Sequence, residues 1–475
     1  MISCSLGWIA SQIKGRLSTD SVSEMQVNQV STDTRTLSSG DLFFALVGEN
    51  FDGHEYLVIA LEKGASALVV SKPVNSPLPT IMVEDTKIAL GLLGAAVKQK
   101  VNPKTIGITG SSGKTTVKEM TASILSQCGK TLFTQGNFNN DIGVPLTLLR
   151  LQSEHEFAVI EMGANHSGEI DYTTHLVKPD VATIVNAAPS HLQGFGSLFG
   201  VARAKSEIYS GIPSDGVALV NTDSQFYEFW LGKTDHCKTL TFSPSSAKGQ
   251  FYATNVSINE DGCAEFELVT PQGKIPIRLR VPGKHNVGNA VLAAALTTQV
   301  GAELPQIQAG LFEMRSVKGR LSVVKLGADV RLMDDTYNAN VASVKAAIDL
   351  LATYAGPRVF VFGDMGELGD QSMQYHQDIG DYAKQNKIDA LISLGELSQH
   401  ASKMLGNQGT HCKSVDDVMQ HLELLIAAAT QAHQLPVNIL VKGSRSARME
   451  RVCEALKNNY NNKAEDGDVQ ESNEC

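Results

Sequence analysis

The sequence predicts an α/β protein that folds in three consecutive blocks. Compact apolar, partly β-branched runs alternate with segments of helical periodicity, the pattern of buried parallel strands joined by helices. The segment SKPVNSPLPT at 71–80 carries three prolines and marks the end of a small first block. The chain of 475 residues is longer than one hydrophobic core usually supports. We therefore expect domains at 1–82, 83–312 and 313–460, followed by a polar, aperiodic and disordered tail at 461–475.

Apolar runs in the first two blocks predict short buried strands. These runs are the segments 42–47, 67–70, 106–109 (IGIT), 157–162 (FAVIEM) and 181–186 (VATIVN). Between them, the apolar residues of 117–128 recur with the spacing of one helix face, which predicts a helix. Within 250–281, Ile275, Ile277, Leu279 and Val281 alternate with polar residues, and turns are expected at Asp261-Gly262 and Gln272-Gly273, so this segment predicts an antiparallel ribbon. A helix from about 286 to 300 closes this block.

The third block repeats the α/β pattern. Strands are expected at 330–335, 358–364, 390–395 and 438–443, with helical stretches such as 341–354 between them. In open parallel sheets, ligands bind at the carboxyl ends of the strands. Asp335, Asp364 and Lys442 each stand at such an end, so the sequence predicts that they lie beside a cleft.

Composition and charge narrow the class of protein. A net charge of −10 argues against a broad nucleic-acid-binding face, which would be basic. The seven cysteines are scattered singly, which is typical of reduced thiols and not of a zinc or disulfide framework. The first residues lack the pattern of a signal peptide, and no apolar stretch has the length of a bilayer span. We expect a cytoplasmic monomer without nucleic-acid partners or membrane insertion.

A phosphate-binding loop is the clearest motif. The predicted strand IGIT runs into GSSGKTT at 110–116, where a helix begins. In such a loop the backbone N–H groups converge on phosphate oxygens. Lys114 would reach the terminal phosphates, and the Thr115 hydroxyl would bind Mg²⁺. Ile108 stands where the general motif has its first glycine, and a surface turn that caps a helix is the simpler alternative.

Further motifs along nearly the whole chain give the sequence a resemblance to the Mur ligase family. The blocks that carry it are EMGANHSGEI (161–170), NAAPSHLQGFGSLFGVARAKSEIY (186–209), PGKHNVGNA (282–290), DDTYNAN (334–340) and VFGDMGELG (361–369). The short phosphate loop is also the form of that family. GNFNNDIGVPLTLL at 136–149 resembles the branch that adds D-alanyl-D-alanine, and the Asp-Asn-Pro-Arg motif of the branch that adds meso-diaminopimelate or lysine is absent.

This resemblance implies an architecture and a reaction. It implies an N-terminal domain for the UDP end of a substrate, a central P-loop ATPase domain with a parallel sheet, and a mobile Rossmann-like C-terminal domain. The expected reaction uses ATP and Mg²⁺ to activate the terminal carboxylate of UDP-N-acetylmuramoyl-tripeptide as an acyl phosphate. The amine of D-alanyl-D-alanine then attacks it, which gives a UDP-linked pentapeptide precursor of peptidoglycan.

The resemblance also assigns nucleotide and metal residues. The expected ATP-binding residues are Thr109, Gly110, Ser111, Ser112, Gly113, Lys114, Thr115, Thr116, Asn286, Asn289, Arg320 and Asp335. Two Mg²⁺ ions are expected, held by Thr115, Glu161, His191 and a carbamylated Lys205. A bare ammonium would repel the metal ions, whereas a carbamate presents an anionic oxygen to them. Lys114, His191, Lys205 and Arg320 are the expected catalytic residues.

The remaining assignments concern the two other substrates. The resemblance assigns the UDP-linked substrate to Ser31, Thr32, Asp33, Arg35, Phe44, Asp52, Gly53, His54, Asn137, Asn139, Asn140 and Asp141. The acceptor is expected at Asp364, Lys442, Ser444 and Arg445, at strand ends of the third block.

Without the resemblance, simpler roles remain open. Glu161 would cap the turn after its strand, and His191 would be a hydrogen-bonded loop histidine. Lys205 would be a solvated helical lysine near Glu207. Asn286 would be a helix N-cap, alone or in addition to contacting adenine.

Simpler roles are equally open for the linker and the N-terminal motif. Arg320 would be an ordinary linker arginine, Asp335 a helix cap at a strand end, and STDTR at 31–35 a plain turn. At the level of function, the nearest rival is another Mur-type ligase or a folylpolyglutamate synthetase with a different acceptor. A P-loop switch or binding module without ligase activity is the rival from another class.

Overall fold

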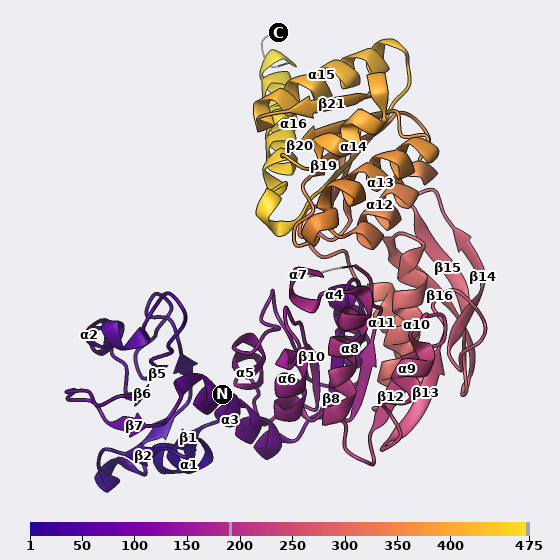
Figure 1. The fold of residues 1–475 in the computed structure, drawn as a ribbon. Helices are drawn as coiled ribbons and strands as arrows, with labels where there is room; N and C mark the ends of the chain where they lie inside the picture. The colour runs from indigo at the N-terminus through magenta and orange to yellow at the C-terminus, as the bar shows by residue number, and fades with distance from the viewer. Residues whose placement is uncertain (190–191, 472–475) are drawn as a thin grey trace.

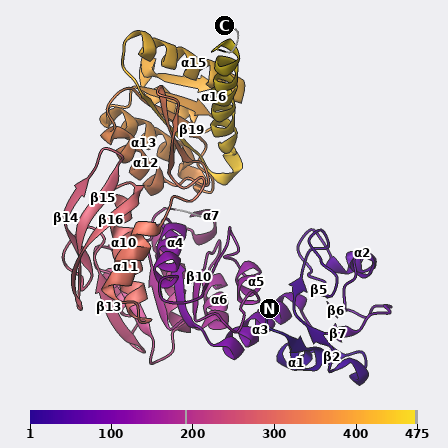
Figure 2. The ribbon, with the colours of Figure 1, turned by 180° about the vertical axis from the view of Figure 1, so that it is seen from behind.

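The computed structural model describes residues 1–189 and 192–471, with side chains through Asn461. The ribbon forms three bodies in chain order: an indigo N-terminal body, a central body, and an orange-to-yellow C-terminal body above the central one (Figure 1). The view from behind shows the N-terminal body beside the central body (Figure 2). Because each body is built on a sheet covered by helices, the predicted α/β class is confirmed.

The N-terminal body holds a five-stranded sheet of order β2-β7-β6-β5-β4. Its strands are β2 (Arg16–Leu17), β4 (Val30–Ser31), β5 (Leu42–Phe44), β6 (Ala67–Val70) and β7 (Thr80–Met82), and β1 (Cys4–Ser5) pairs separately with β3 (Gln26–Val27). Its helices are α1 (Leu6–Gln12), η1 (Asp20–Val22), η2 (Gly53–Tyr56) and α2 (Leu57–Glu62). The runs predicted at 42–47 and 67–70 therefore contain strands, which pair in parallel.

The central body is a six-stranded parallel sheet of order β13-β12-β11-β8-β10-β9. Its strands are β8 (Lys104–Thr109), β9 (Thr131–Phe133), β10 (Phe157–Glu161), β11 (Val181–Ile184), β12 (Val217–Asn221) and β13 (Lys238–Phe242). Its helices are α3 (Thr86–Val101), α4 (Lys114–Leu125), α5 (Gly143–Leu148), α6 (Glu169–Val177), α7 (Leu192–Phe195), α8 (Leu198–Ser206), η3 (Glu207–Gly211) and α9 (Tyr227–Leu231). The three strands predicted here are confirmed.

An antiparallel ribbon follows the central sheet. It consists of β14 (Tyr252–Ile258), β15 (Cys263–Thr270) and β16 (Gly273–Pro282). Both predicted turns lie between these strands, and Gly262 and Gly273 have positive φ angles of 76° and 135° there. The predicted helix appears as α10 (His285–Thr298), followed by α11 (Leu304–Glu313).

The C-terminal body is a six-stranded sheet of order β17-β18-β22-β19-β20-β21. Only its edge strand β17 is antiparallel. The strands are β17 (Ser322–Leu326), β18 (Val330–Asp335), β19 (Arg358–Gly363), β20 (Ala390–Leu394), β21 (Gly409–Cys412) and β22 (Val437–Lys442). The helices are α12 (Val341–Thr353), η4 (Gly369–Gln371), α13 (Ser372–Gln385), α14 (Gln399–Met404), η5 (Gly406–Gln408), α15 (Val415–Gln431), η6 (Arg445–Ala447) and α16 (Glu450–Glu471). The four strands predicted in this block are confirmed.

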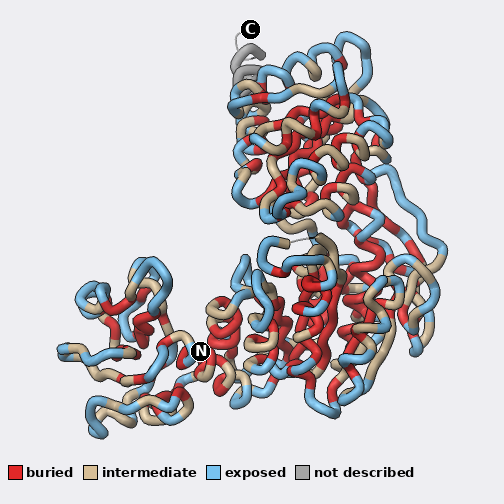
Figure 3. Tube along the Cα trace, in the orientation of Figure 1, coloured by how far each residue is buried: buried red, intermediate tan, exposed pale blue. Residues whose placement is uncertain are grey.

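Buried strands explain the continuous apolar runs of the sequence. In β19, Phe360 and Phe362 pack into the hydrophobic cluster on one face of the sheet, and Val359 and Val361 pack into the cluster on the other face. Alternate side chains of a strand point to opposite faces, so a strand covered on both sides needs apolar residues at every position. The buried segments accordingly gather in the interior of the bodies, with exposed segments around them (Figure 3).

Two expectations differ from the structure. The segment 461–471, predicted as part of an irregular tail, continues α16, because a helix that has already formed gains one backbone hydrogen bond for each residue it adds; residues 472–475 of that tail lie outside the described residues. The sequence did not predict four edge strands, because short edge strands carry a weak apolar pattern; these are β9, β13, β17 and β21. The sequence analysis also missed the interior strand β12, although it is apolar. Within the described residues, none of the helices combines the length and apolar character that a bilayer crossing requires.

Candidate active site

The loop after β8 has the shape of a phosphate cradle. It leads from Thr109 to Lys114, where α4 begins three residues before the start predicted from periodicity. Gly113 precedes the helix with φ of 78°, and a Cβ there would lie 3.1 Å from Oδ1 of Asn289. A side chain would therefore be strained at this position. The loop and the helix N-terminus expose backbone N–H groups of the kind that bind phosphate oxygens.

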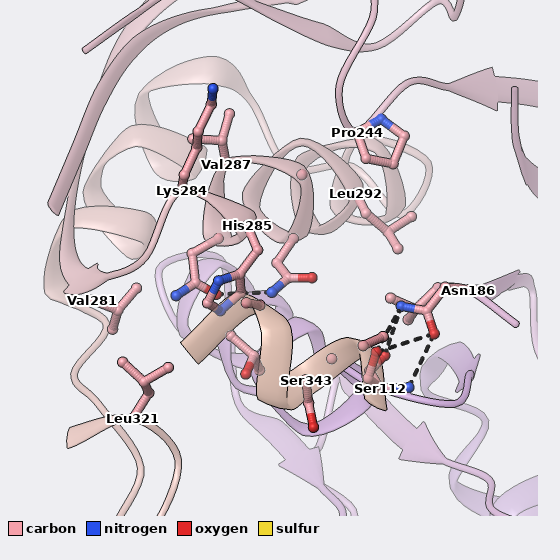
Figure 4. Close-up of a pocket in the computed structure, with 18 of the residues that line it drawn as sticks. Ser112, Asn186, Pro244, Val281, Lys284, His285, Val287, Leu292, Leu321 and Ser343 are labelled. Atoms are coloured by element: carbon pink, nitrogen blue, oxygen red, sulfur yellow. Dashed lines mark hydrogen bonds between the residues drawn. The ribbon is translucent and has the colours of Figure 1, made fainter. Parts of the chain in front are cut away.

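A second residue holds this loop in place. Asn186, just beyond the end of β11, accepts a hydrogen bond from the Ser112 N–H at 3.0 Å and donates to the Ser112 carbonyl at 3.1 Å (Figure 4). The Asn186 carbonyl also accepts from the Ser111 N–H at 3.0 Å. Asn186 lies in one of the sequence motifs, but the motif predicted no role for it. Its contact with the loop depends on β8 and β11 being neighbours in the sheet.

Lys114 turns back on its own loop. Its Nζ donates to the Gly110 carbonyl at 2.7 Å. Burial lowers the pKa of Lys114, and the nearby Arg320 guanidinium lowers it as well, whereas Glu161 raises it. An incoming polyanion would favour the charged ammonium, so the lysine is suited to phosphate binding.

Glu161 ends β10 directly beside the loop. Its Oε2 accepts from the Thr115 hydroxyl at 3.1 Å, and its Oε1 accepts from the Asn139 amide at 2.8 Å. The carboxylate is buried and contacts the phosphate loop, so the alternative of a simple turn cap is wrong. A carboxylate and a hydroxyl in contact are oxygen donors of the kind that Mg²⁺ prefers.

The donor set fits Mg²⁺ in combination with a nucleotide. Among residues 1–189 and 192–471, no group of three or more His, Cys, Asp or Glu side chains is arranged to hold a metal ion. Mg²⁺ commonly binds through one or two protein ligands and completes its shell with phosphate oxygens and water. Glu161 and Thr115 match that pattern. His191, predicted as a ligand of the second ion, lies outside the described residues.

Lys205 lies at the end of α8 and is buried, with 2% of its surface exposed. The alternative of a solvated lysine is therefore wrong. The Glu207 carboxylate points elsewhere and accepts from the backbone N–H groups of Gly168 and Asp171. Burial lowers the pKa of Lys205 well below its ordinary value, and the nearby Lys114 ammonium lowers it further. The lowered pKa shifts this lysine toward the neutral amine.

A cavity of about 710 Å³ adjoins the phosphate loop. It is lined by the loop, the start of α10 and the facing part of the C-terminal body, as the close-up shows with Ser112, His285 and Ser343 (Figure 4). Asn286 is the second residue of α10 and Lys284 holds the N-cap position, so the N-cap alternative for Asn286 is wrong. Instead its amide donates to the Pro282 carbonyl at 2.7 Å and accepts from Asn289 at 2.8 Å.

The C-terminal body forms the opposite wall of the cavity. Arg320 donates to the Thr115 hydroxyl at 3.2 Å, and its guanidinium stacks 3.9 Å from the ring centroid of Tyr337. The role of an ordinary linker arginine is therefore wrong. Asn340, which caps α12, donates to the Ser111 carbonyl at 3.4 Å. Since Asn340 holds the cap, Asp335 is not a helix cap; its carboxylate pairs with Lys442.

Sequence reasoning missed several residues of this cavity. They are His285, Asn338, Asn340, Ser343 and Asp349. His285, Asn338 and Asn340 lie in the sequence motifs that carry the family resemblance, and Ser343 and Asp349 lie in α12, the helix that follows one of these motifs. The motifs therefore indicated the neighbourhood, while the choice of residue depended on how the two bodies face each other.

In the N-terminal body, the STDTR segment is a turn closed by its own side chains. The Ser31 hydroxyl donates to the Asp33 carbonyl, and the Asp33 carboxylate accepts from the Arg35 backbone and guanidinium. The Arg35 guanidinium holds the pKa of Asp33 at about 2. The Arg35 side chain is 85% exposed, so it is accessible to a ligand, and the UDP assignment of this segment, Thr32 included, stays a prediction.

Two other residues of this prediction have structural roles. Phe44 is fully buried in the core, so the prediction that it contacts the substrate is wrong for its side chain. The predicted run was apolar because β5 is covered on both faces. His54 is also buried: its Nε2 accepts from the Ser71 N–H at 3.0 Å, so Nδ1 carries the proton and donates to Asp52 at 2.6 Å.

Close packing explains the glycine beside this histidine. A Cβ on Gly53 would lie 2.7 Å from the Leu46 carbonyl oxygen, and the Gly53 N–H donates to that same oxygen at 2.7 Å. The requirement for glycine is therefore accounted for by backbone packing. Ligand contact through the Gly53 backbone stays a prediction.

The asparagine-rich segment after β9 makes its contacts within the central body. Asn139 contacts Glu161, and Asp141 pairs with Lys87 of α3 at 2.7 Å. Asn140 accepts from the Gly143 N–H at 2.8 Å, at the start of α5. Asn137 is exposed. The segment thus runs from Glu161, beside the phosphate loop, to α3, and the contact with the peptide part of the substrate stays a prediction.

The predicted acceptor residues divide into two groups. Lys442 lines the nucleotide cavity, whereas Asp364, Ser444 and Arg445 do not. Asp364 forms hydrogen bonds to two other loops. Its Oδ1 accepts from the Leu397 N–H at 3.1 Å and from the Ser398 N–H at 2.7 Å. Its backbone carbonyl accepts from the Ser444 hydroxyl at 2.6 Å. Arg445 pairs with Glu450 at 3.1 Å and remains accessible.

Replacing Asp364 with alanine is expected to loosen this group of loops. Two backbone N–H groups would lose their acceptor, which costs about 2 kcal/mol locally. Hydrogen exchange at the amides of Leu397 and Ser398 should become faster, while the exposed control variant Asp370→Ala should leave it unchanged. Unchanged protection of these two amides in Asp364→Ala would show that the carboxylate does not hold the loops.

Comparison with known proteins accounts for this arrangement. Three family models match: the Mur ligase catalytic domain over 26–110, the Mur ligase middle domain over 108–297, and the Mur ligase glutamate ligase domain over 319–445. The chain belongs to the Mur ligase family. The family predicted from the sequence is therefore confirmed.

Curated relatives match the chain over nearly its full length. The UDP-N-acetylmuramoyl-tripeptide–D-alanyl-D-alanine ligase of Escherichia coli (strain K12) is 47% identical, with 97% of this chain and 99% of the relative covered. The enzyme of the same name from Haemophilus influenzae is 45% identical, with 96% and 99% covered. The Mur ligase family thus includes relatives close to this chain in both length and sequence.

Solved structures agree with the fold. A crystal structure of MurF from Acinetobacter baumannii superposes with a TM-score of 0.90 at 37% identity and covers 96% of this chain and 99% of its own. The MurF ligase of Thermotoga maritima in complex with ADP has a TM-score of 0.80 at 26% identity, with 92% and 99% covered. The folylpolyglutamate synthase of Mycobacterium tuberculosis shares the fold at a TM-score of 0.62 and 16% identity, with 77% and 94% covered.

Proposed function

We propose that this chain ligates D-alanyl-D-alanine to UDP-N-acetylmuramoyl-tripeptide at the expense of ATP. The product is a UDP-linked pentapeptide, a precursor for peptidoglycan and so for cell-wall growth and division. The observation that carries the substrate assignment is full-length identity of 45–47% to relatives named for this reaction. The contact between the phosphate loop, Glu161 and Arg320 supports the use of ATP.

The reaction joins two groups that do not react unaided. The terminal carboxylate of the tripeptide attacks the γ-phosphorus of ATP, which forms an acyl phosphate and releases ADP. The amine of D-alanyl-D-alanine then attacks the acyl carbon, and phosphate leaves as the peptide bond forms. Because the first step brings two anions together, the site must neutralise negative charge.

Residues of this chain supply much of that neutralisation. When ATP binds, the Lys114 ammonium gives up its hydrogen bond to the Gly110 carbonyl and contacts phosphate oxygens instead. Arg320 lies beside Thr115, where its forked guanidinium can bind phosphate oxygens. Thr115 and Glu161 would hold one Mg²⁺, and His191 with a modified Lys205 would hold a second. When bound, Mg²⁺ neutralises charge on the phosphates.

The modification proposed for Lys205 is a carbamate. The neutral amine attacks CO₂, forms an N–C bond and loses a proton, which leaves an anionic carboxylate on the side chain. The lowered pKa of Lys205 favours the neutral amine that this step requires. The carbamate then offers an oxygen ligand in place of a cation.

In this proposal, residues at the start of α10 bind the adenine. The paired amides of Asn286 and Asn289 line the cavity, and an amide can both donate to and accept from the edge of a base. We further propose that the enzyme works in the cytoplasm as a monomer.

Mass spectrometry of the product tests this function. The purified chain with ATP, Mg²⁺, UDP-tripeptide and D-alanyl-D-alanine should give the pentapeptide, whereas glutamate, lysine or meso-diaminopimelate in place of the dipeptide should give no ligated product. Ligation of one of these different acceptors would identify a different Mur-type ligase. ATP hydrolysis without any new peptide bond would favour a P-loop switch.

Domain closure is a further expected result. The acceptor residues Asp364, Ser444 and Arg445 lie in a different body from the phosphate loop and outside the nucleotide cavity. Reacting atoms must approach within about 3–3.5 Å. Small-angle scattering should therefore give a smaller radius of gyration when ATP and the UDP-tripeptide are bound together. An unchanged radius would exclude a large closure.

A further inference from the structure

Lys442 differs from the other residues predicted at the acceptor site. Its side chain is buried at the end of β22, and it lines the nucleotide cavity together with Asp335. Its Nζ donates to Oδ2 of Asp335 and, at 3.0 Å, to the carbonyl of Asn338. Asp335 is the last residue of β18, and Asn338 lies in the segment that connects β18 to α12. The ammonium is thus held inside the wall of the nucleotide site.

These contacts fix the segment 335–340. The segment begins at Asp335, which stands opposite Lys442 in the parallel register of β18 and β22. It ends at Asn340, which caps α12 through the Ser343 N–H at 2.9 Å and reaches the Ser111 carbonyl of the phosphate loop at 3.4 Å. Lys442 therefore connects the central strand of the C-terminal sheet to the part of that body that meets the loop.

The charges around this pair explain why the lysine matters. Burial raises the pKa of Asp335 and lowers that of Lys442, and the contact between the two groups opposes both shifts because each stabilises the charged form of the other. Without the lysine, Asp335 would remain as a buried carboxylate in a cavity that receives a polyanion. A buried polar group without a partner is costly, and the segment would rearrange to reach solvent.

We propose that Lys442 is a positioning residue for the nucleoside triphosphate and acts through Asp335 and the segment 335–340. This assignment rests on the proposed function and replaces the acceptor-binding role predicted from the sequence. The acceptor is then left to the loops that Asp364 ties together outside the nucleotide cavity.

Steady-state kinetics of Lys442→Met test this role. The variant should raise KM for ATP by about 10-fold or more, with KM for D-alanyl-D-alanine changed by less than about 3-fold. Binding of ADP to the full-length chain, measured by calorimetry without acceptor, should weaken by the same factor. Asp335→Asn should shift the same two quantities. Since ADP binding requires no ligation, this readout stays interpretable even if the wild-type chain proves to use another acceptor.

Lys457→Met is the matched control. Lys457 faces the neighbouring carboxylate of the same strand, Asp334, at 3.9 Å, and it does not line the cavity. This variant should leave both KM values unchanged. An increase confined to KM for D-alanyl-D-alanine in Lys442→Met would overturn the proposal, as would unchanged ADP binding. If Lys442→Met fails to fold, unchanged ADP binding by folded Asp335→Asn would overturn it equally.

Discussion

Lys205→Arg is expected to lose activity by at least about 100-fold, an effect comparable to removal of one charge-stabilising group from an active site. Arginine keeps the positive charge and much of the length but forms no stable carbamate. The buried site would then present a cation to Mg²⁺, and even two like unit charges 4 Å apart repel by about 4 kcal/mol at an effective dielectric constant of 20. Turnover with saturating substrates measures the loss.

Chemical rescue separates the carbamate from a purely structural role. Lys205→Ala should be equally inactive, and acetate or formate should partly restore its turnover by placing a carboxylate in the vacated space. Arg203→Ala is the control, because Arg203 lies on the exposed side of the same helix and should be dispensable. Near-normal turnover of Lys205→Arg would contradict the account of the metal site.

Lys114→Ala is expected to abolish ligation, with a loss of at least about 10³-fold, as for other residues that neutralise a transferring phosphoryl group. The side chain contacts only the carbonyl of its own loop among the hydrogen bonds described. The free energy of unfolding should therefore change by about 0.5 kcal/mol or less. Product formation and thermal unfolding without ligands measure the two quantities.

A second lysine provides the comparison for this prediction. Lys130 forms an exposed pair with Glu154 at 3.1 Å, and Lys130→Ala should change neither activity nor stability. A large fall in the unfolding temperature of Lys114→Ala would contradict the prediction, because the lysine would then be needed for folding. Retained ligation would contradict the phosphate-binding role itself.

The sequence by itself determined the features that are local along the chain. The run IGIT followed by GSSGKTT predicts a strand, a loop and a helix start, because a buried strand, glycines and helical periodicity each act within a few residues. The structure has β8, the loop and α4 there. Glu161 could be placed at a strand end for the same reason, and its motif indicated the metal site.

Only the tertiary structure decided how distant residues meet. Lys442 and Asp335 are 107 positions apart, and they touch because β18 lies next to β22 while β19, β20 and β21 lie on the other side. No local pattern states this strand order. Likewise, Phe44 and Lys205 have their roles decided by burial, which depends on what packs over them. Strand order and burial arise from contacts between segments far apart in the chain. The periodicity of a sequence shows only which side chains of one segment lie on the same face.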